Sequence, residues 1–74
     1  MSQSTRLREH LDSGKSVTRL AALVDLSIFE LSARIVGLES EGYPIHKERV
    51  KVTNRFGESI SVVEYSKKIN VHLP

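Results

Sequence analysis

The sequence has no cysteine and no tryptophan, and its 74 residues include only two prolines, two phenylalanines and two tyrosines. The lack of cysteine excludes disulfide bonds and thiolate metal ligands, and three scattered histidines predict no zinc site. No apolar run approaches the roughly 18 residues that a membrane span requires, and no apolar segment follows the charged N-terminus, as it would in a secretory signal. We therefore expect a cytoplasmic protein that folds by hydrophobic packing alone, without cofactor, metal or membrane contact.

The charge is distributed unevenly along the chain. The net charge is only +2, but residues 1–43 carry five basic and six acidic side chains, whereas residues 44–74 carry six basic and three acidic ones. A basic excess favours contact with a polyanion. Such contact is therefore expected in the C-terminal part of the chain.

Two short helices are predicted in the N-terminal part. Ser4 is a candidate N-cap for a helix over residues 4–12, whose Leu7 and Leu11 share one face, and Ser13-Gly14 ends it. Thr18 is the candidate N-cap of a second helix over residues 18–24. The apolar stripe expected on that second helix consists of Leu20, Leu23 and Val24.

A third helix has the strongest local pattern. Ser27 and Glu30 have the spacing of a capping box, in which each side chain bonds a free backbone N–H of the first turn. Behind them apolar residues recur three or four positions apart, as expected of one buried helix face, and Gly42 ends the helix. These apolar residues are Ile28, Leu31, Ile35 and Leu38.

From Ile45 onward the apolar period changes to two, which is typical of strands. Residues 49–53 and 59–65 alternate on either side of residues 54–57, a turn candidate with Asn and Gly at its ends, and so predict a β-hairpin. The adjacent Val62 and Val63 interrupt the alternation. Either a bulge or a strand buried on both faces explains this, and the pattern does not choose between them.

Three helices followed by a hairpin are the element order of a winged helix-turn-helix domain. We predict an α+β, mainly helical fold, with a single domain over residues 1–68 and a short tail over residues 69–74. In such a domain the third helix enters the major groove of DNA and the hairpin wing meets the phosphates. We expect the hairpin valines to cover a core that contains Leu7, Leu11, Leu20, Leu23, Leu31, Ile35 and Leu38.

Several segments resemble the small helix-turn-helix proteins of tailed bacteriophages and prophages. These are TRLAAL at residues 18–23, IFELSARIVGL at 28–38, EGYPI at 41–45 and VTNRFG at 52–57. The similarity extends over about residues 5–66. Ser27 stands where these proteins usually have Gly, and Glu30 stands where they usually have a basic residue. The resemblance implies a DNA-binding fold of phage origin.

Candidate DNA-contacting residues fall into three groups. On the third helix Arg34 and Ser32 could bond base edges and Ala33 could touch thymine methyl groups, while pairing of Arg34 with Glu30 or Glu41 is the structural alternative. The wing supplies basic side chains and a polar turn, although strand charges also discourage pairing with another chain. Lys15 and Arg19 flank the N-terminus of the second helix, a position that favours binding of a phosphate group. The candidates are Lys15, Arg19, Phe29, Ser32, Ala33, Arg34, Lys47, Arg49, Lys51, Asn54 and Arg55.

Two functions are consistent with these patterns, and neither is enzymatic, because no nucleotide-binding loop, nucleophile motif or metalloprotease motif is present. The first is binding of double-stranded DNA by a phage-encoded transcriptional regulator or architectural factor, for which a homodimer would enlarge the contact. The second is a protein-interaction module of the same fold. It would bind a host protein such as RNA polymerase, or another phage protein, through the face that carries Phe29, Glu30, Ala33 and Val36.

Overall fold

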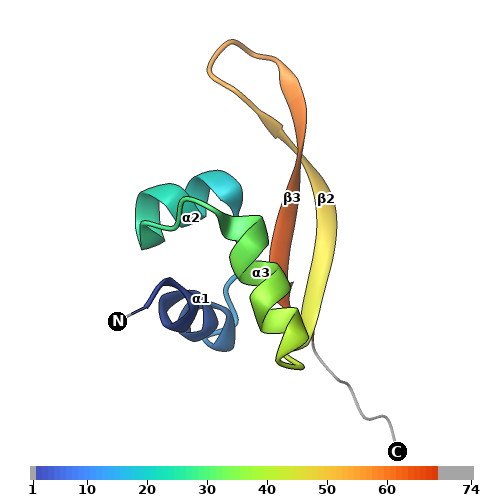
Figure 1. Ribbon diagram of the computed structural model, residues 1–74. Coiled ribbons are helices and arrows are strands. Elements are labelled where there is room, and N and C mark those ends of the chain that lie inside the picture. The colour runs from blue at the N-terminus through green and yellow to red at the C-terminus, as the bar shows by residue number, and fades with distance from the viewer. Residues whose placement is uncertain (1, 69–74) are drawn as a thin grey trace, which may run out of the picture.

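The computed structural model describes residues 2–68, and the predicted tail over residues 69–74 lies outside this range. Figure 1 shows the helices gathered beside a sheet, two strands of which continue past the helices as a long hairpin. None of the helices in this range is long and apolar enough to cross a membrane. The elements in chain order are α1 (Gln3–Asp12), β1 (Val17–Thr18), α2 (Arg19–Leu26), α3 (Leu31–Ser40), β2 (Ile45–Thr53) and β3 (Ser59–Lys67).

Hydroxyl side chains cap the first two helices. The Oγ of Ser2 accepts a hydrogen bond from the backbone N–H of Thr5 at 3.1 Å, so the predicted cap at Ser4 is wrong. The reason is conformational, because Ser2 has the extended backbone of an N-cap and Ser4 is already helical. The Thr18 cap is confirmed, since its Oγ1 accepts from the N–H of Ala21 at 3.3 Å.

The capping box predicted at the start of the third helix is wrong. Ser27 has a left-handed backbone (φ 55°) and ends α2, a position where glycine is the usual residue. Glu30 is the N-cap of α3 but makes no side-chain capping bond. Because Ser27 turns the chain before Ile28, its hydroxyl lies outside the first turn of α3.

The end of α3 follows from a left-handed glycine, as predicted. Gly42 has φ 88° and donates its N–H to the carbonyl of Glu39, while Tyr43 donates to the carbonyl of Leu38, both at 3.0 Å. These two bonds form a Schellman motif, which satisfies the last helical carbonyls and turns the chain out of the helix. The chain therefore enters β2 immediately afterwards.

The sheet is antiparallel, with the strand order β1-β3-β2. The pairing of β2 with β3 is continuous from Ile45 opposite Lys67 to Thr53 opposite Ser59, so the sequence slip at Val62 and Val63 is not a bulge. Both valines are half-buried. The two-residue β1, where Val17 pairs with Tyr65, was not predicted. Three helices and this sheet confirm the α+β class.

The core lies between the helices and the end of the sheet that contains Ile45 and Tyr65. Leu20 and Leu23 were expected in it, but 70% and 41% of their surfaces are exposed. The small Ala22 faces inward on α2 in their place. Partly buried side chains, Ile45 and Tyr65 of the strands and Tyr43 before β2, cover the core where valines were expected. The buried residues are Leu7, Leu11, Val17, Ala22, Ile28, Leu31, Ile35 and Leu38.

Candidate nucleic-acid interface

Two ion pairs fasten the base of the hairpin to the helices. The Nζ of Lys47 on β2 lies 3.4 Å from Oε1 of Glu39 on α3, and the Nζ of Lys67 on β3 lies 3.2 Å from Oδ1 of Asp12 on α1. Each pair joins a basic residue of the C-terminal part to an acidic residue of the helical part. Of the lysines at the base of the hairpin, Lys47 and Lys67 are therefore neutralised, whereas Lys68 has no carboxylate partner in the part of the chain that the structure describes.

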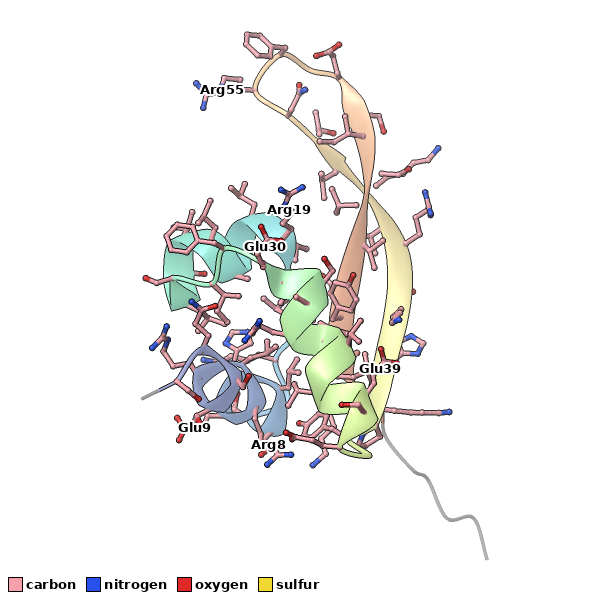
Figure 2. All side chains as sticks on the ribbon, viewed as in Figure 1. Arg8, Glu9, Arg19, Glu30, Glu39 and Arg55 are labelled. Atoms are coloured by element: carbon pink, nitrogen blue, oxygen red, sulfur yellow. The ribbon has the colours of Figure 1, made fainter. Side chains whose placement is uncertain are left out.

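The outer half of the hairpin retains its positive charge. Lys47, Arg49 and Lys51 alternate along β2 and share one face, as predicted, opposite to that of Val50 and Val52. Arg49, Lys51 and Arg55 are exposed, and within residues 2–68 no carboxylate pairs with any of them. Figure 2 shows Arg55 at the hairpin tip, far from the helices.

Asn54 holds the loop at the hairpin tip. Its Oδ1 accepts from the N–H groups of Phe56 at 2.9 Å and of Glu58 at 3.0 Å, and its Nδ2 donates to Oε1 of Glu58 at 3.1 Å. The backbone N–H of Asn54 also donates to the carbonyl of Glu58. Asn54, a predicted DNA contact, thus uses its side chain within the loop and fixes where Arg55 and Phe56 project.

The outer face of α3 has uncharged, mostly small side chains as far as Gly37. Ser32, Ala33 and Val36 are exposed beside Gly37, whereas Arg34 is half-buried at the edge of this face. The Nε of Arg34 is shielded from solvent and has no partner in the described part of the chain, and Glu41 pairs with Arg8 instead. Small side chains allow close approach to a DNA groove but provide few hydrogen-bond donors.

The remaining candidates lie around α2. Arg19 is the exposed first residue of α2, and Lys15 is exposed in the connection between α1 and β1. Figure 2 places Arg19 and Glu30 at the same end of the helical layer, the end toward the hairpin tip that carries Arg55. Phe29, in the turn before α3, is exposed. The structure thus brings Arg19 to the same side as the tip, whereas Lys47 lies at the hairpin base, bonded to Glu39.

Two apolar features were missed by the sequence analysis. A groove runs between α2 and β3, and the exposed Leu20 and Leu23 form part of its wall. Phe56 at the hairpin tip is also exposed, and the only sequence signal for this was its position inside the predicted turn. Among residues 2–68 no cluster of His, Asp or Glu is arranged to hold a metal ion. The groove is lined by Thr18, Arg19, Leu20, Leu23, Val62, Val63 and Tyr65.

The order of the helices and the C-terminal hairpin agree with the comparison of the chain with known families. The family described as winged helix-turn-helix domain matches residues 2–66. No curated protein and no solved structure matches the chain. The family match spans both the helical layer and the hairpin, and this domain suggests DNA binding. The chain therefore belongs to the winged helix-turn-helix domain family.

Proposed function

We propose that this protein binds double-stranded DNA, with the outer half of the hairpin on the phosphate backbone and α3 in the major groove. It acts as a transcriptional regulator or an architectural factor in the cytoplasm of a bacterial host. The resemblance to small phage and prophage proteins supports a phage origin. The proposal is for a binding function and involves no catalytic step.

One observation carries this proposal. Lys47 and Lys67 at the base of the hairpin are paired with helix carboxylates, but Arg49, Lys51 and Arg55 have no such partner among the described residues. A charge that is already paired within the protein gains little from a phosphate, whereas an exposed unpaired charge releases counterions when it binds one. Three unpaired positive charges therefore lie together on the outer half of the hairpin. Arg19 extends the positive surface toward α3.

The chemistry of α3 suits close approach more than extensive base recognition. Ala33 and Val36 can contact thymine methyl groups, and Ser32 can bond a base edge. Arg34 is the longest donor on this helix, but its half-buried position restricts its reach. We therefore expect phosphate contacts to supply most of the affinity, with a modest sequence preference from α3.

Salt dependence provides the test. If Arg19, Arg49, Lys51 and Arg55 each contact a phosphate, the logarithm of the binding constant falls with the logarithm of salt concentration with a slope of roughly −3.6. Fluorescence anisotropy with a labelled random duplex, at about 50 mM and about 200 mM salt, should show roughly a 100-fold loss of affinity. No binding at the lower salt concentration would contradict the proposal.

Charge-matched variants separate wing contacts from a general effect of net charge. Lys51→Ala and Lys68→Ala remove the same charge, but Lys68 lies at the base of the hairpin, just after β3. We expect Lys51→Ala to weaken binding to every duplex and to reduce the salt slope by about 1, and Lys68→Ala to change both much less. Equal effects of the two substitutions would argue against a wing contact.

A second candidate function is favoured by the exposed apolar side chains of α2. Leu20 and Val24 are 70% and 69% exposed, and Phe29 in the following turn is 68% exposed. Several large apolar side chains exposed on one helix and the turn after it favour a protein interface. Binding to purified bacterial RNA polymerase that is insensitive to salt and is abolished by Leu20→Ser with Val24→Ser would support this alternative. Unchanged binding by this double variant would reject it.

A further inference from the structure

Phe56 at the hairpin tip has no role in the core of the fold. It is 79% exposed, the largest exposed fraction among the large apolar side chains of the described residues. It lies between Arg55 and Gly57 in the loop that joins β2 to β3, at the end of the hairpin farthest from the helices (Figure 1). Single exposed apolar residues are common on protein surfaces. The exposure of Phe56 alone therefore assigns it no function.

Hydrogen bonds order the loop backbone that carries the Phe56 ring. The N–H of Phe56 itself donates to Oδ1 of Asn54 at 2.9 Å, and the N–H of Gly57 donates to the carbonyl of Asn54 at 3.0 Å. Gly57 has φ 78°, a conformation that glycine adopts without strain. The backbone that carries the ring is thus held in place before any ligand binds, which reduces the entropy lost on binding.

Positively charged residues precede Phe56 in the chain. Arg55 precedes Phe56, and Lys51 and Arg49 continue the positive charge along β2. The nearest acidic side chain in the sequence, Glu58, is bonded to Nδ2 of Asn54. An apolar ring at the end of a cationic strand complements duplex DNA, where phosphates attract the cations and the stacked base pairs accept an apolar side chain.

We propose that Phe56 inserts between base pairs from the minor groove and kinks the duplex, while Arg55 binds beside it in the groove or on the adjacent phosphate. This inference rests on the proposed DNA binding by the wing. Side chains that act as wedges partly unstack a base step and bend the helix toward the major groove. Pyrimidine–purine steps unstack most easily, so Phe56 favours sites that contain TA or CA/TG steps.

This role supplies a specificity that α3 provides only in part. The exposed side chains Ala33 and Val36 have no hydrogen-bonding groups for base edges, and Arg34 is half-buried. A protein that bends DNA distinguishes sequences by how easily they deform, without bonding each base. Phe56 and α3 thus respond to different properties of the same DNA site. Phe56 responds to how easily the duplex deforms, and α3 responds to the base edges in the major groove.

The test measures bending and unstacking separately from affinity. A duplex of about 30 bp with a central TA step carries a dye pair at its ends and 2-aminopurine at the step. The wild-type protein should increase energy transfer between the dyes and increase 2-aminopurine fluorescence. Phe56→Ala should bind with an affinity within about tenfold of the wild type while losing both signals. Phe56→Leu, which keeps an apolar wedge, should retain part of each.

Leu20→Ala is the matched control, because it truncates another exposed apolar side chain, 70% exposed on α2, outside the wing. It should bend DNA like the wild type. Binding by the wild type without a bend, or an equal bend by Phe56→Ala, would overturn the wedge and leave the proposed function standing. Preferential loss of single-strand binding in Phe56→Ala would also overturn it, because the ring would then stack on unpaired bases. Failure of the wild type to bind any duplex would overturn both proposals.

Discussion

The hydroxyl of Tyr43 donates a 2.6 Å hydrogen bond to Oδ1 of Asp12, the same carboxylate oxygen that Lys67 approaches at 3.2 Å. Asp12 is the last residue of α1, Tyr43 follows α3, and Lys67 ends β3. The charged groups of Arg8 and Lys67 also lie 5.3 Å and 5.6 Å from the centre of the Tyr43 ring, within cation–π range. One carboxylate thus connects the helical layer to the base of the hairpin.

The first prediction concerns acid stability. The hydrogen bond from Tyr43, followed by the bond and charge of Lys67, lowers the pKa of Asp12 below 3.8 in the folded state. A carboxyl group with a lowered pKa stabilises the fold at pH values above its ordinary pKa, and this contribution is lost as the pH falls through the folded pKa. Asp12→Asn should therefore lower the urea midpoint near pH 7, with a difference from wild type that shrinks at strongly acidic pH.

Glu9→Gln is the control for this measurement. Glu9 lies one turn before Asp12 on α1, and within residues 2–68 its side chain has no ion pair or side-chain hydrogen bond. Its neutralisation should leave the midpoint near pH 7 unchanged. Identical midpoints for Asp12→Asn and wild type at that pH would show that the Asp12 contacts do not stabilise the fold.

The second prediction concerns alkaline pH. Burial, and secondarily the hydrogen bond to Asp12, raises the pKa of Tyr43 from 10.0 to about 12. Because the folded state favours the protonated phenol, its contribution to stability is complete below pH 10 and is lost between pH 10 and about 12. The near-ultraviolet titration of wild type minus Tyr43→Phe should give a midpoint near 12 in the folded protein. A midpoint near 10 would contradict the half-buried phenol that is hydrogen-bonded to Asp12.

The third prediction compares two lysines on the same face of β2. Lys47 is paired with Glu39, whereas Lys51 has no carboxylate partner within the described range. Lys47→Ala should therefore weaken duplex binding less than Lys51→Ala, and Glu39→Gln should raise affinity and steepen the salt slope by at most about 1. Fluorescence anisotropy at two salt concentrations measures all three variants. A larger loss for Lys47→Ala would place the DNA nearer the hairpin base.

The fourth prediction concerns the face of α2. Ala22 is fully buried, whereas Leu20 is 70% exposed. Enlarging the buried site with Ala22→Leu should lower the free energy of unfolding by about 1–3 kcal/mol through overpacking. Leu20→Ala should change it by no more than about 0.5 kcal/mol, because the side chain is largely in water already. Urea denaturation of both variants tests this, and the reverse order of effects would show that α2 is rotated from its described position.

The sequence predicted α3 well because a helix that packs on one side must repeat its apolar residues every three or four positions. Leu31, Ile35 and Leu38 are all buried, as expected. The same reasoning failed for α2, which has eight residues, too few for a clear period, and more apolar side chains than it buries. Its fully buried residue, Ala22, is small, and a small residue contributes little to a periodic apolar pattern.

The sequence predicted which basic residues belong to the candidate site, but not which of them are free of ion pairs within the protein. The alternation of Arg49 and Lys51 indicated one basic face of β2, and Figure 2 shows Arg55 at the tip where the turn pattern placed it. Pairing of the other cations depends on distant residues, such as Lys67 with Asp12, which are 55 positions apart in the sequence. The two-residue β1 also depends on tertiary pairing with β3, because so short a strand has no period of its own.

The two ion pairs at the base of the hairpin act together with the core packing of Ile45 and Tyr65 to orient the hairpin on the helices. From Lys47 to Thr53 the strand advances about 20 Å, so a tilt of about 10° at the base displaces the tip by about 3.5 Å. That displacement is more than half the roughly 6 Å width of a minor groove. The contacts of Lys47 with Glu39 and of Lys67 with Asp12 lie at the base of this long hairpin, so a small change of angle there becomes a large displacement of the side chains at the tip.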